Sequence, residues 1–309
     1  MANLVTTTVS NVREDLSDVI SRISPEKTPF WTEIGKSTAK ATFHEFLNRE
    51  LSPPVVNAAA ENATFGAANG TGPDRLGNYT QIFTKVAGVS GTLESVDSAG
   101  YKSAIADQIA IETANLKRDI EFALIGASAS QGGSTRRLGG GEAWISTNAD
   151  HGVGGSTPGY ANGLVGAVTA GTTRPLAEQM YNDNMQDVWE AGGNVTKVFV
   201  SGSLKQAISK FSGNATRYQD MNKSATIYGA VDVYVSDFGT QTIIPHHFMS
   251  KTTVLSVDPS LWSVATLRKL TKTELPKTKD SIEYSLLTEL TLVCKNEAGN
   301  GKIADVTAA

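Results

Sequence analysis

Two adjacent histidines, His246 and His247, come closest in this sequence to residues whose types and spacing could do catalytic chemistry. An imidazole titrates near neutral pH and can act as a general base, so the pair suggests a small hydrolase. On a strand, however, adjacent side chains point to opposite faces, so the two rings could not easily bind one metal ion. The simpler interpretation is a pair of half-buried or solvated histidines, and the hydrolase stays as an alternative.

The other motifs that chemistry commonly uses are incomplete. Gly35-Lys36-Ser37 ends like a phosphate-binding loop, but the first glycine of that loop would fall at Phe30. Gly152-Val-Gly154 lacks the third glycine of a dinucleotide-binding turn, and no Gly-x-Ser-x-Gly elbow is present. The remaining candidates stand alone in the sequence: His44, His151 and Cys294. We therefore expect no catalytic, cofactor-binding or metal-binding residues, and no enzymatic activity.

The composition excludes several classes of protein. The 309 residues include 29 Gly and one Cys, and 19% are charged, compared with about 25% in a typical soluble domain. The net charge of −4 argues against a protein whose main task is to grip a nucleic-acid backbone. A single cysteine cannot form an intrachain disulfide, and no apolar run is long enough to span a membrane. We also expect no signal peptide, and hence synthesis in the cytoplasm.

The most regular element is a helix predicted over residues 98–126, with Ser98 as its N-cap and Gly126 as its end. Its apolar stripe consists of Ile105, Ile109, Leu116, Ile120 and Leu124. The charged residues lie mainly off that stripe: Lys102, Asp107, Lys117, Arg118 and Glu121. Such a helix would be about 40 Å long, which suggests a spine along which other elements pack.

Residues 41–94 read as two extended stretches, 42–51 and 79–90, on either side of a loop rich in Pro, Ala and Gly. A loop this long generally has a task, and a hairpin that lies on a neighbouring subunit is one such task. Residues 126–171 contain 13 glycines and are expected to form ordered loop.

The N-terminal 40 residues are predicted to form an arm with a short helix over 9–23. Phe30 and Trp31 follow Pro25 and Pro29, and they suit either an anchor on another surface or an ordinary local core. Further along, the pattern predicts helices over 176–192 and 202–212 and strands over 197–201, 231–235, 242–244, 253–257 and 281–293. This order indicates an α+β fold with a mostly antiparallel sheet. The basic run 268–279 reads as a solvated edge or a subunit contact.

Taken in order, these parts resemble the major capsid proteins of tailed phages, which have the Hong Kong 97-like fold. The resemblance rests on residues 77–92, on Leu116-Lys-Arg-Asp-Ile-Glu-Phe-Ala-Leu124, on Val254-Leu-Ser-Val-Asp-Pro-Ser-Leu-Trp262 and on residues 289–303. It implies an N-terminal arm (1–40), an extended loop (41–94), a peripheral domain with spine helix and glycine-rich loop (95–172), an axial domain (173–262) and a return to the peripheral domain (263–309).

The resemblance also implies a function: self-assembly of hexamers and pentamers into an icosahedral or prolate shell around phage double-stranded DNA. The expected partners are the chain itself and portal, scaffold and decoration proteins, with no sequence-specific DNA binding and no membrane. The expected location is the virion, after synthesis in the host cytoplasm. A cellular encapsulin-like cage is the alternative with the same fold, and a tail-tube component is a third possibility. Some relatives crosslink their subunits through Lys and Asn, but we predict no crosslink at Lys36, Lys40 or Lys85.

Overall fold

The computed structural model describes residues 27–49, 51, 54–64, 70, 72–96, 103–211 and 233–308. The chain divides into two compact units. The smaller unit contains the described residues of Thr84–Leu116 and Thr271–Leu287. The larger unit contains those of Lys27–Phe83, Lys117–Leu270 and Thr288–Ala309. The chain therefore passes repeatedly from one unit to the other, and several of its elements have residues in both.

The larger unit is built on a six-stranded mixed sheet with the order β10-β11-β9-β12-β15-β5. Its strands are β5 (Ala149–Asp150), β9 (Lys197–Val200), β10 (Val233–Ser236), β11 (Gly239–Pro245), β12 (Val254–Val257) and β15 (Gly301–Ile303). The pairs β11–β9 and β15–β5 are parallel, and the other three pairs are antiparallel. Most of the pairs are thus antiparallel, as the sequence suggested, and the two parallel pairs make the sheet mixed.

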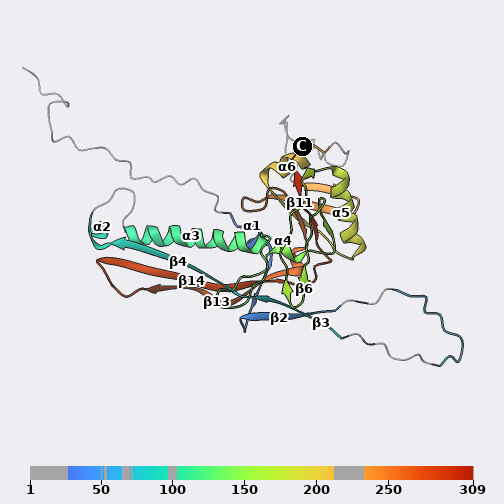
Figure 1. Cartoon of the computed structure of the whole chain (residues 1–309), viewed down its shortest axis with the longest axis horizontal. Helices are drawn as coiled ribbons and strands as arrows, with labels where there is room; N and C mark the ends of the chain where they lie inside the picture. Colours follow the sequence, from blue (N-terminus) through green and yellow to red (C-terminus); the bar gives the residue numbers. More distant parts are fainter. Residues whose placement is uncertain are drawn as a thin grey trace, which may run out of the picture. The chain divides into compact units, whose positions relative to one another are not determined.

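The central strand β9 buries residues on both of its faces, which explains its unbroken apolar run Val198-Phe199-Val200. Val198 and Val200 join a core formed with helices α5 (Glu178–Glu190) and α6 (Gly202–Ile208), which lie beside the sheet in Figure 1. Phe199 lies on the opposite face, where its ring meets that of Phe30 edge to face at 5.4 Å between centroids. Trp262 completes this second cluster at 6.0 Å from Phe30.

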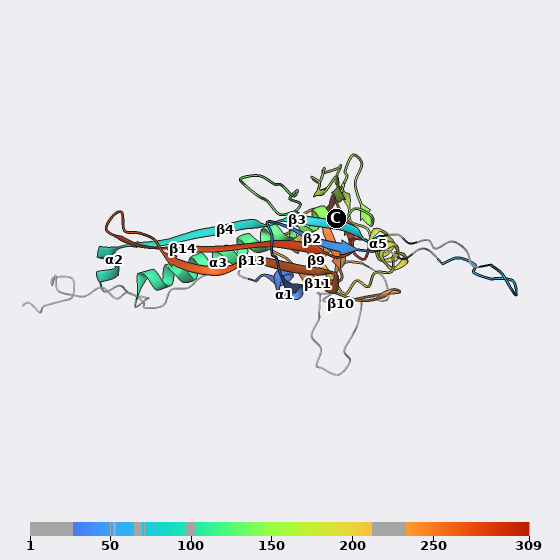
Figure 2. The same cartoon turned by 90° about the horizontal axis from the view of Figure 1, so that it is seen from below.

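A second sheet has the order β1-β13-β14-β4, and helix α3 (Ala104–Ile125) is the longest helix of the described chain. Its strands are β1 (Gly35–Thr38), β4 (Gln81–Ser90), β13 (Trp262–Glu274) and β14 (Ser281–Cys294). Within the smaller unit, the first half of α3 lies beside β4 and the β13–β14 hairpin (Figure 1 and Figure 2). Helix α2 (Gly91–Ser95) follows β4 and is capped by the Ser90 side chain, which accepts a hydrogen bond from the Leu93 amide.

A separate two-stranded ribbon pairs β2 (Phe43–Asn48) with β3 (Asp74–Tyr79) in antiparallel register, from Phe43 opposite Tyr79 to Asn48 opposite Asp74. The hairpin expected from the sequence therefore exists, but its returning strand is 74–79 and not 79–90. Residues 81–90 belong to β4 in the other sheet. The sequence Asp-Arg-Leu-Gly-Asn-Tyr of β3 does not predict a strand, because Asp, Gly and Asn are disfavoured in strands. Pairing with β2 stabilises the strand in spite of this composition.

The remaining elements are short. They are α1 (Pro29–Glu33), α4 (Gly141–Trp144), β6 (Tyr160–Ala161), β7 (Leu164–Val165), β8 (Arg174–Pro175), a 3-10 helix (Pro259–Leu261) and β16 (Val306–Thr307). Several of them lie in the glycine-rich segment 126–171, where Leu138, Trp144 and Ile145 are fully buried. That segment is ordered, as expected, and it contributes more to the core than its composition suggests.

The predicted helices and strands after residue 170 are confirmed with small shifts of their ends. The expected helix over 9–23 and the expected N-cap Ser98 lie outside the described residues. Near the start of α3, the Ser103 hydroxyl instead accepts a hydrogen bond from the Ala106 amide. Strand β13 was missed, because its second half, with the run Arg268-Lys269, alternates polar and apolar residues too weakly to read as a strand.

Candidate assembly surface

Four strongly exposed apolar side chains of the described larger unit lie close together in sequence, on β2 and the segment after it. Leu47, Leu51, Val55 and Val56 are 67%, 93%, 80% and 98% exposed. Large apolar residues at this level of exposure mark surfaces that contact another molecule when they lie close together in one segment. The described residues 51 and 54–60 belong to no helix or strand and are all exposed, so no other part of the described chain buries their side chains.

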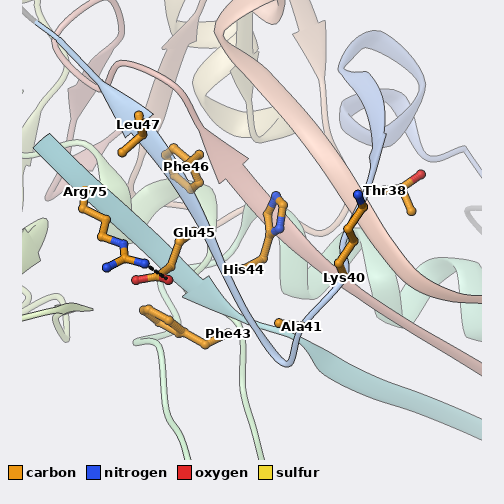
Figure 3. Close-up of a pocket in the computed structure, with 9 residues that line it drawn as sticks. All are labelled: Thr38, Lys40, Ala41, Phe43, His44, Glu45, Phe46, Leu47 and Arg75. Atoms are coloured by element: carbon orange, nitrogen blue, oxygen red, sulfur yellow. Dashed lines mark ion pairs between the residues drawn. The ribbon is translucent and has the colours of Figure 1, made fainter. Parts of the chain in front are cut away.

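A groove of about 530 Å³ lies at the base of the same ribbon (Figure 3). It is lined by Thr38, Lys40, Ala41, Phe43, His44, Glu45, Phe46, Leu47 and Arg75. Figure 3 shows the Glu45 carboxylate facing the Arg75 guanidinium across the two strands, at 2.9 Å. The groove thus combines aromatic walls with cationic groups and one ion pair. Such a lining suits contact with a peptide segment better than chemistry, since His44 has no polar partner in the lining.

The base of the ribbon is attached to the larger unit through Asn78, whose side chain is fully buried. Its Nδ2 donates to the carbonyl of Leu292 at 2.9 Å, and its Oδ1 accepts from the Ser130 hydroxyl at 3.0 Å. Phe46, on the opposite strand, packs against Trp144 with the ring centroids 5.9 Å apart. The ribbon is therefore fixed at its base by polar and aromatic contacts, while its far end is exposed.

A second attachment is the carboxylate of Glu289 on β14, which is buried beside two arginines. It accepts hydrogen bonds from Thr80 Oγ1 at 2.7 Å, Arg136 Nη2 at 2.7 Å and Arg268 Nε at 2.8 Å. Burial raises the pKa of Glu289, but these hydrogen bonds outweigh it and leave the pKa below its ordinary value. The charged form of Glu289 is therefore the one that joins β14, β13 and the residues around the ribbon base.

Buried charges also hold the glycine-rich segment. Lys302 Nζ donates to the backbone carbonyl of Glu142 at 2.8 Å and to Thr157 Oγ1. Burial lowers the pKa of Lys302 to about 8, against the opposing effects of Glu142 and Asp305. Burial likewise raises the pKa of Glu142 to about 7, an effect that Lys302 partly offsets. The pKa values of both groups therefore lie near neutral pH.

The structure separates the two histidines that the sequence singled out. His246 directly follows β11 and is buried, and its Nε2 lies 2.7 Å from Glu121 Oε1, while His247 is exposed. His246 is thus more deeply buried than expected, because the buried Glu121 carboxylate compensates its polar ring. A hydrolase that uses both residues is not supported. Among the described residues, no group of three or more His, Cys, Asp or Glu side chains could hold a metal ion.

The other single candidates have structural surroundings. His151 Nε2 lies 3.0 Å from Thr157 Oγ1, and burial followed by the charge of Lys302 lowers its pKa. His44 lies on the ribbon, and partial burial lowers its pKa. Cys294 is fully buried at the end of β14, as expected, and its pKa is raised by burial. Phe30 is fully buried in the core of its own unit, so it is a local core residue and not an anchor on another surface.

Sequence reasoning missed Asn78, Glu121 and Glu289 as polar side chains that join distant segments. A polar residue beside apolar neighbours is a weak signal, and Glu121 was placed off the helix stripe although it is fully buried. No helix within the described part of the chain is both long and apolar enough to cross a membrane.

Comparison with known proteins relates this arrangement to phage heads. A family model described as "SU10 major capsid protein" matches residues 2–307. The capsid of Cyanophage A-1(L) is similar in structure, with a TM-score of 0.66 at 12% identity over 98% of this chain and 100% of that chain. The capsid of the native GTA particle has a TM-score of 0.64 at 14% identity over 98% of both chains. The SrpI encapsulin of Synechococcus elongatus PCC 7942 has a TM-score of 0.57 at 12% identity, over 100% of this chain and 98% of its own.

At these identities the structural neighbours show the shared fold, and no curated protein matches the chain. The family model covers almost every residue, from the N-terminal segment to β16. It supports the phage interpretation and not the encapsulin-like alternative. The resemblance drawn from the sequence is confirmed: the chain belongs to the SU10 major capsid protein family and is a major capsid protein, a structural component of a bacteriophage head.

Proposed function

We propose that this chain self-assembles through hexameric and pentameric capsomers into a closed icosahedral or prolate shell around phage double-stranded DNA. The observation that carries the proposal is the exposed apolar segment from Leu47 to Val56 on a ribbon with a fixed base. Burying apolar surface is worth roughly 25 cal/mol per Å², and repeated weak contacts add up when a symmetric shell closes. The proposed role of the chain is structural, and we propose no catalytic activity for it.

Within the shell, we assign residues 1–40 to an N-terminal arm and 41–94 to an extended loop over a neighbouring copy. Residues 95–172 and 263–309 form the peripheral domain, and 173–262 form the axial domain. The ribbon β2–β3 and the long helix α3 support this division, since they occupy the segments assigned to the loop and the spine. Four of the six strands of the mixed sheet, β9 to β12, lie between residues 197 and 257 and support the axial assignment, while β5 and β15 come from the segments assigned to the peripheral domain.

The chain would enter the virion after synthesis in the host cytoplasm and would meet portal, scaffold and decoration proteins there. Its net charge of −4 supports a shell that encloses DNA without sequence-specific binding, since a negatively charged protein does not attract the phosphate backbone.

The register of the ribbon allows a sharp test of the loop. Asn48 lies opposite Asp74, so residues 49–73 can be replaced by Asn-Gly, which closes a two-residue hairpin on the same register. The shortened chain keeps both strands and the fixed base, including Leu47, but lacks the exposed Leu51, Val55 and Val56. A matched control replaces only the exposed residues 57–60 with Gly and Ser, which keeps the length and the apolar Leu51, Val55 and Val56.

Sedimentation and negative-stain images decide the outcome. Wild type and control form shells or capsomer rings, and the shortened chain stays soluble and folded but does not close shells. Shell formation by the shortened chain overturns the role of the loop. A wild-type chain that remains monomeric at high concentration, with phage partner proteins present, overturns the shell itself. Particles that hold protein cargo and no DNA would identify a cellular cage instead.

A further inference from the structure

Helix α1 has no side-chain cap of its own, although its first amides are buried or partly buried. The residue before it, Thr28, makes no side-chain capping hydrogen bond, and Pro29 has no amide hydrogen to donate. The next two amides, of Phe30 and Trp31, would therefore lack partners within the helix. A five-residue helix is also too short to be stable alone. Something outside the helix must satisfy these amides.

The missing acceptor is Glu121, 90 residues further along the chain on α3. Its Oε1 accepts the Phe30 amide at 2.7 Å and its Oε2 accepts the Trp31 amide at 2.9 Å. Both carboxylate oxygens are thus used as a long-range N-cap for α1. Because Glu121 is fully buried, removing its charge would leave the buried Phe30 amide and the partly buried Trp31 amide competing for fewer acceptors.

The carboxylate is itself held in place by His246. Nε2 of His246 lies 2.7 Å from Glu121 Oε1, and its Nδ1 accepts the Phe248 amide at 3.1 Å. Since Nδ1 accepts, the ring proton resides on Nε2 and is donated to Glu121. The ring lies edge to face against Phe199. Glu121 is therefore oriented by the turn after β11 and cannot rotate away from α1 without breaking this chain of hydrogen bonds.

Further contacts of α1 and β1 also hold α1 in place. Lys36 Nζ donates to the Trp31 carbonyl and its ammonium lies 5.4 Å from the centre of the Trp31 ring. Glu33 pairs with Lys197 on β9 at 3.4 Å. The Phe30 ring fills the space between Phe199 and Trp262. Together these contacts hold α1 against β1, β9 and the aromatic cluster of the larger unit.

We propose that Glu121 is an assembly-positioning residue: it caps α1 from a distance and so fixes the place where Lys27 and Thr28 join the larger unit, which assembly of the shell requires. Its effect on assembly rests on the shell function proposed above, whereas its effect on α1 does not. His246 supports it by orienting the carboxylate. The cap is long-range because it must attach α1 to α3, which a local capping residue would not do.

Hydrogen exchange measured on the full chain tests the attachment without any mutation. In the wild type, the Phe30 and Trp31 amides should exchange as slowly as the buried end of α3, at Leu124 and Ile125. Exchange of these two amides at the rate of exposed amides overturns the proposal directly. This measurement remains valid if wild-type shells do not form, so it separates the cap from the shell function.

Two variants then distinguish positioning from simple capping. Glu121→Gln keeps one acceptor oxygen and should raise the exchange rate of the Phe30 and Trp31 amides at least about tenfold and reduce shell yield. Adding Thr28→Asp supplies a local cap and should restore most of the protection of these amides. If Glu121 acts by positioning, shell yield stays low in the double variant. Recovery of assembly by Thr28→Asp would show that capping alone suffices and overturn the proposal.

A pair of histidine variants checks the support of the carboxylate. His246→Gln keeps a donor near Nε2, and His246→Asn keeps an acceptor near Nδ1 but cannot reach Glu121. Protection of the Phe30 and Trp31 amides should persist in the first and fall in the second, with His247→Gln as the exposed control. Equal protection in the Gln and Asn variants overturns the role of His246.

Discussion

Asn78 and Gly139 are hydrogen-bonded in both directions: Asn78 Oδ1 accepts the Gly139 amide at 2.8 Å, and Asn78 Nδ2 donates to the Gly139 carbonyl at 3.1 Å. This side chain imitates a strand pairing between β3 and a loop 61 residues away. It joins the ribbon, the glycine-rich segment and β14 without any regular sheet between them.

Asn78→Ala should therefore destabilise the larger unit strongly, because it leaves the Gly139 amide and the Gly139 and Leu292 carbonyls buried without this partner. We expect a loss of about 3 kcal/mol or more in the free energy of unfolding, measured by urea denaturation. Asn57→Ala, at an exposed position, is the control and should change it by less than about 0.5 kcal/mol. Equal stability of the two variants would contradict the role given to Asn78.

Glu142→Gln should flatten the pH dependence of stability. The pKa of Glu142 is about 7 in the folded chain and near 4.5 when unfolded, so the folded state binds this proton more tightly. Stability must then fall as the pH rises from 4.5 to 7, by up to about 1.4 kcal/mol per pH unit from this group. Denaturation at pH 5, 6, 7 and 8 measures the slope, with exposed Glu190→Gln as the control. A slope that Glu142→Gln leaves unchanged would rule out Glu142 as its source.

Arg136→Gln should make the protein more sensitive to acid. The pKa of Glu289 is lowered in the folded chain, so its stabilising effect is present above the unfolded value near 4.5 and is lost as the pH falls through the folded value. Removing the Arg136 donor brings the folded pKa closer to the unfolded one. The acid-unfolding midpoint, followed by tryptophan fluorescence, should move to higher pH. Arg75→Gln, in the more exposed ion pair with Glu45, should leave the midpoint in place.

Gly140→Ala should prevent normal packing of the glycine-rich segment. A Cβ at residue 140 would overlap the carbonyl oxygen of Gly126 and lie 2.9 Å from that of Ala123, and neither backbone oxygen can move easily. We expect a loss at the upper end of the range for overpacked cores, about 3 kcal/mol in the free energy of unfolding. Gly202→Ala at the start of α6 meets nothing within 4 Å and should stabilise by about 0.5 kcal/mol. Thermal melts of both variants give the comparison, and similar melting temperatures would contradict it.

The sequence by itself was sufficient for the elements whose signal is local. The apolar spacing along α3 predicted the buried Leu116, Ile120 and Leu124, and the run Lys197-Val-Phe-Val predicted β9. Periodicity of this kind survives folding, because one face of a helix, or the unbroken run of a buried strand, must be apolar wherever the element packs. The four segments 77–92, 116–124, 254–262 and 289–303 were also enough to indicate the capsid family.

Tertiary structure decided the rest, since it depends on which distant residues meet. The composition of Asp-Arg-Leu-Gly-Asn-Tyr does not predict strand β3, which forms because β2 supplies its hydrogen-bond partners. The burial of Glu121, against the pattern of its own helix, follows from two amides of α1 and a histidine ring that each need a partner. A polar side chain is buried only where its hydrogen bonds are completed, and the residues that complete them are separated by 90 or more positions in the chain.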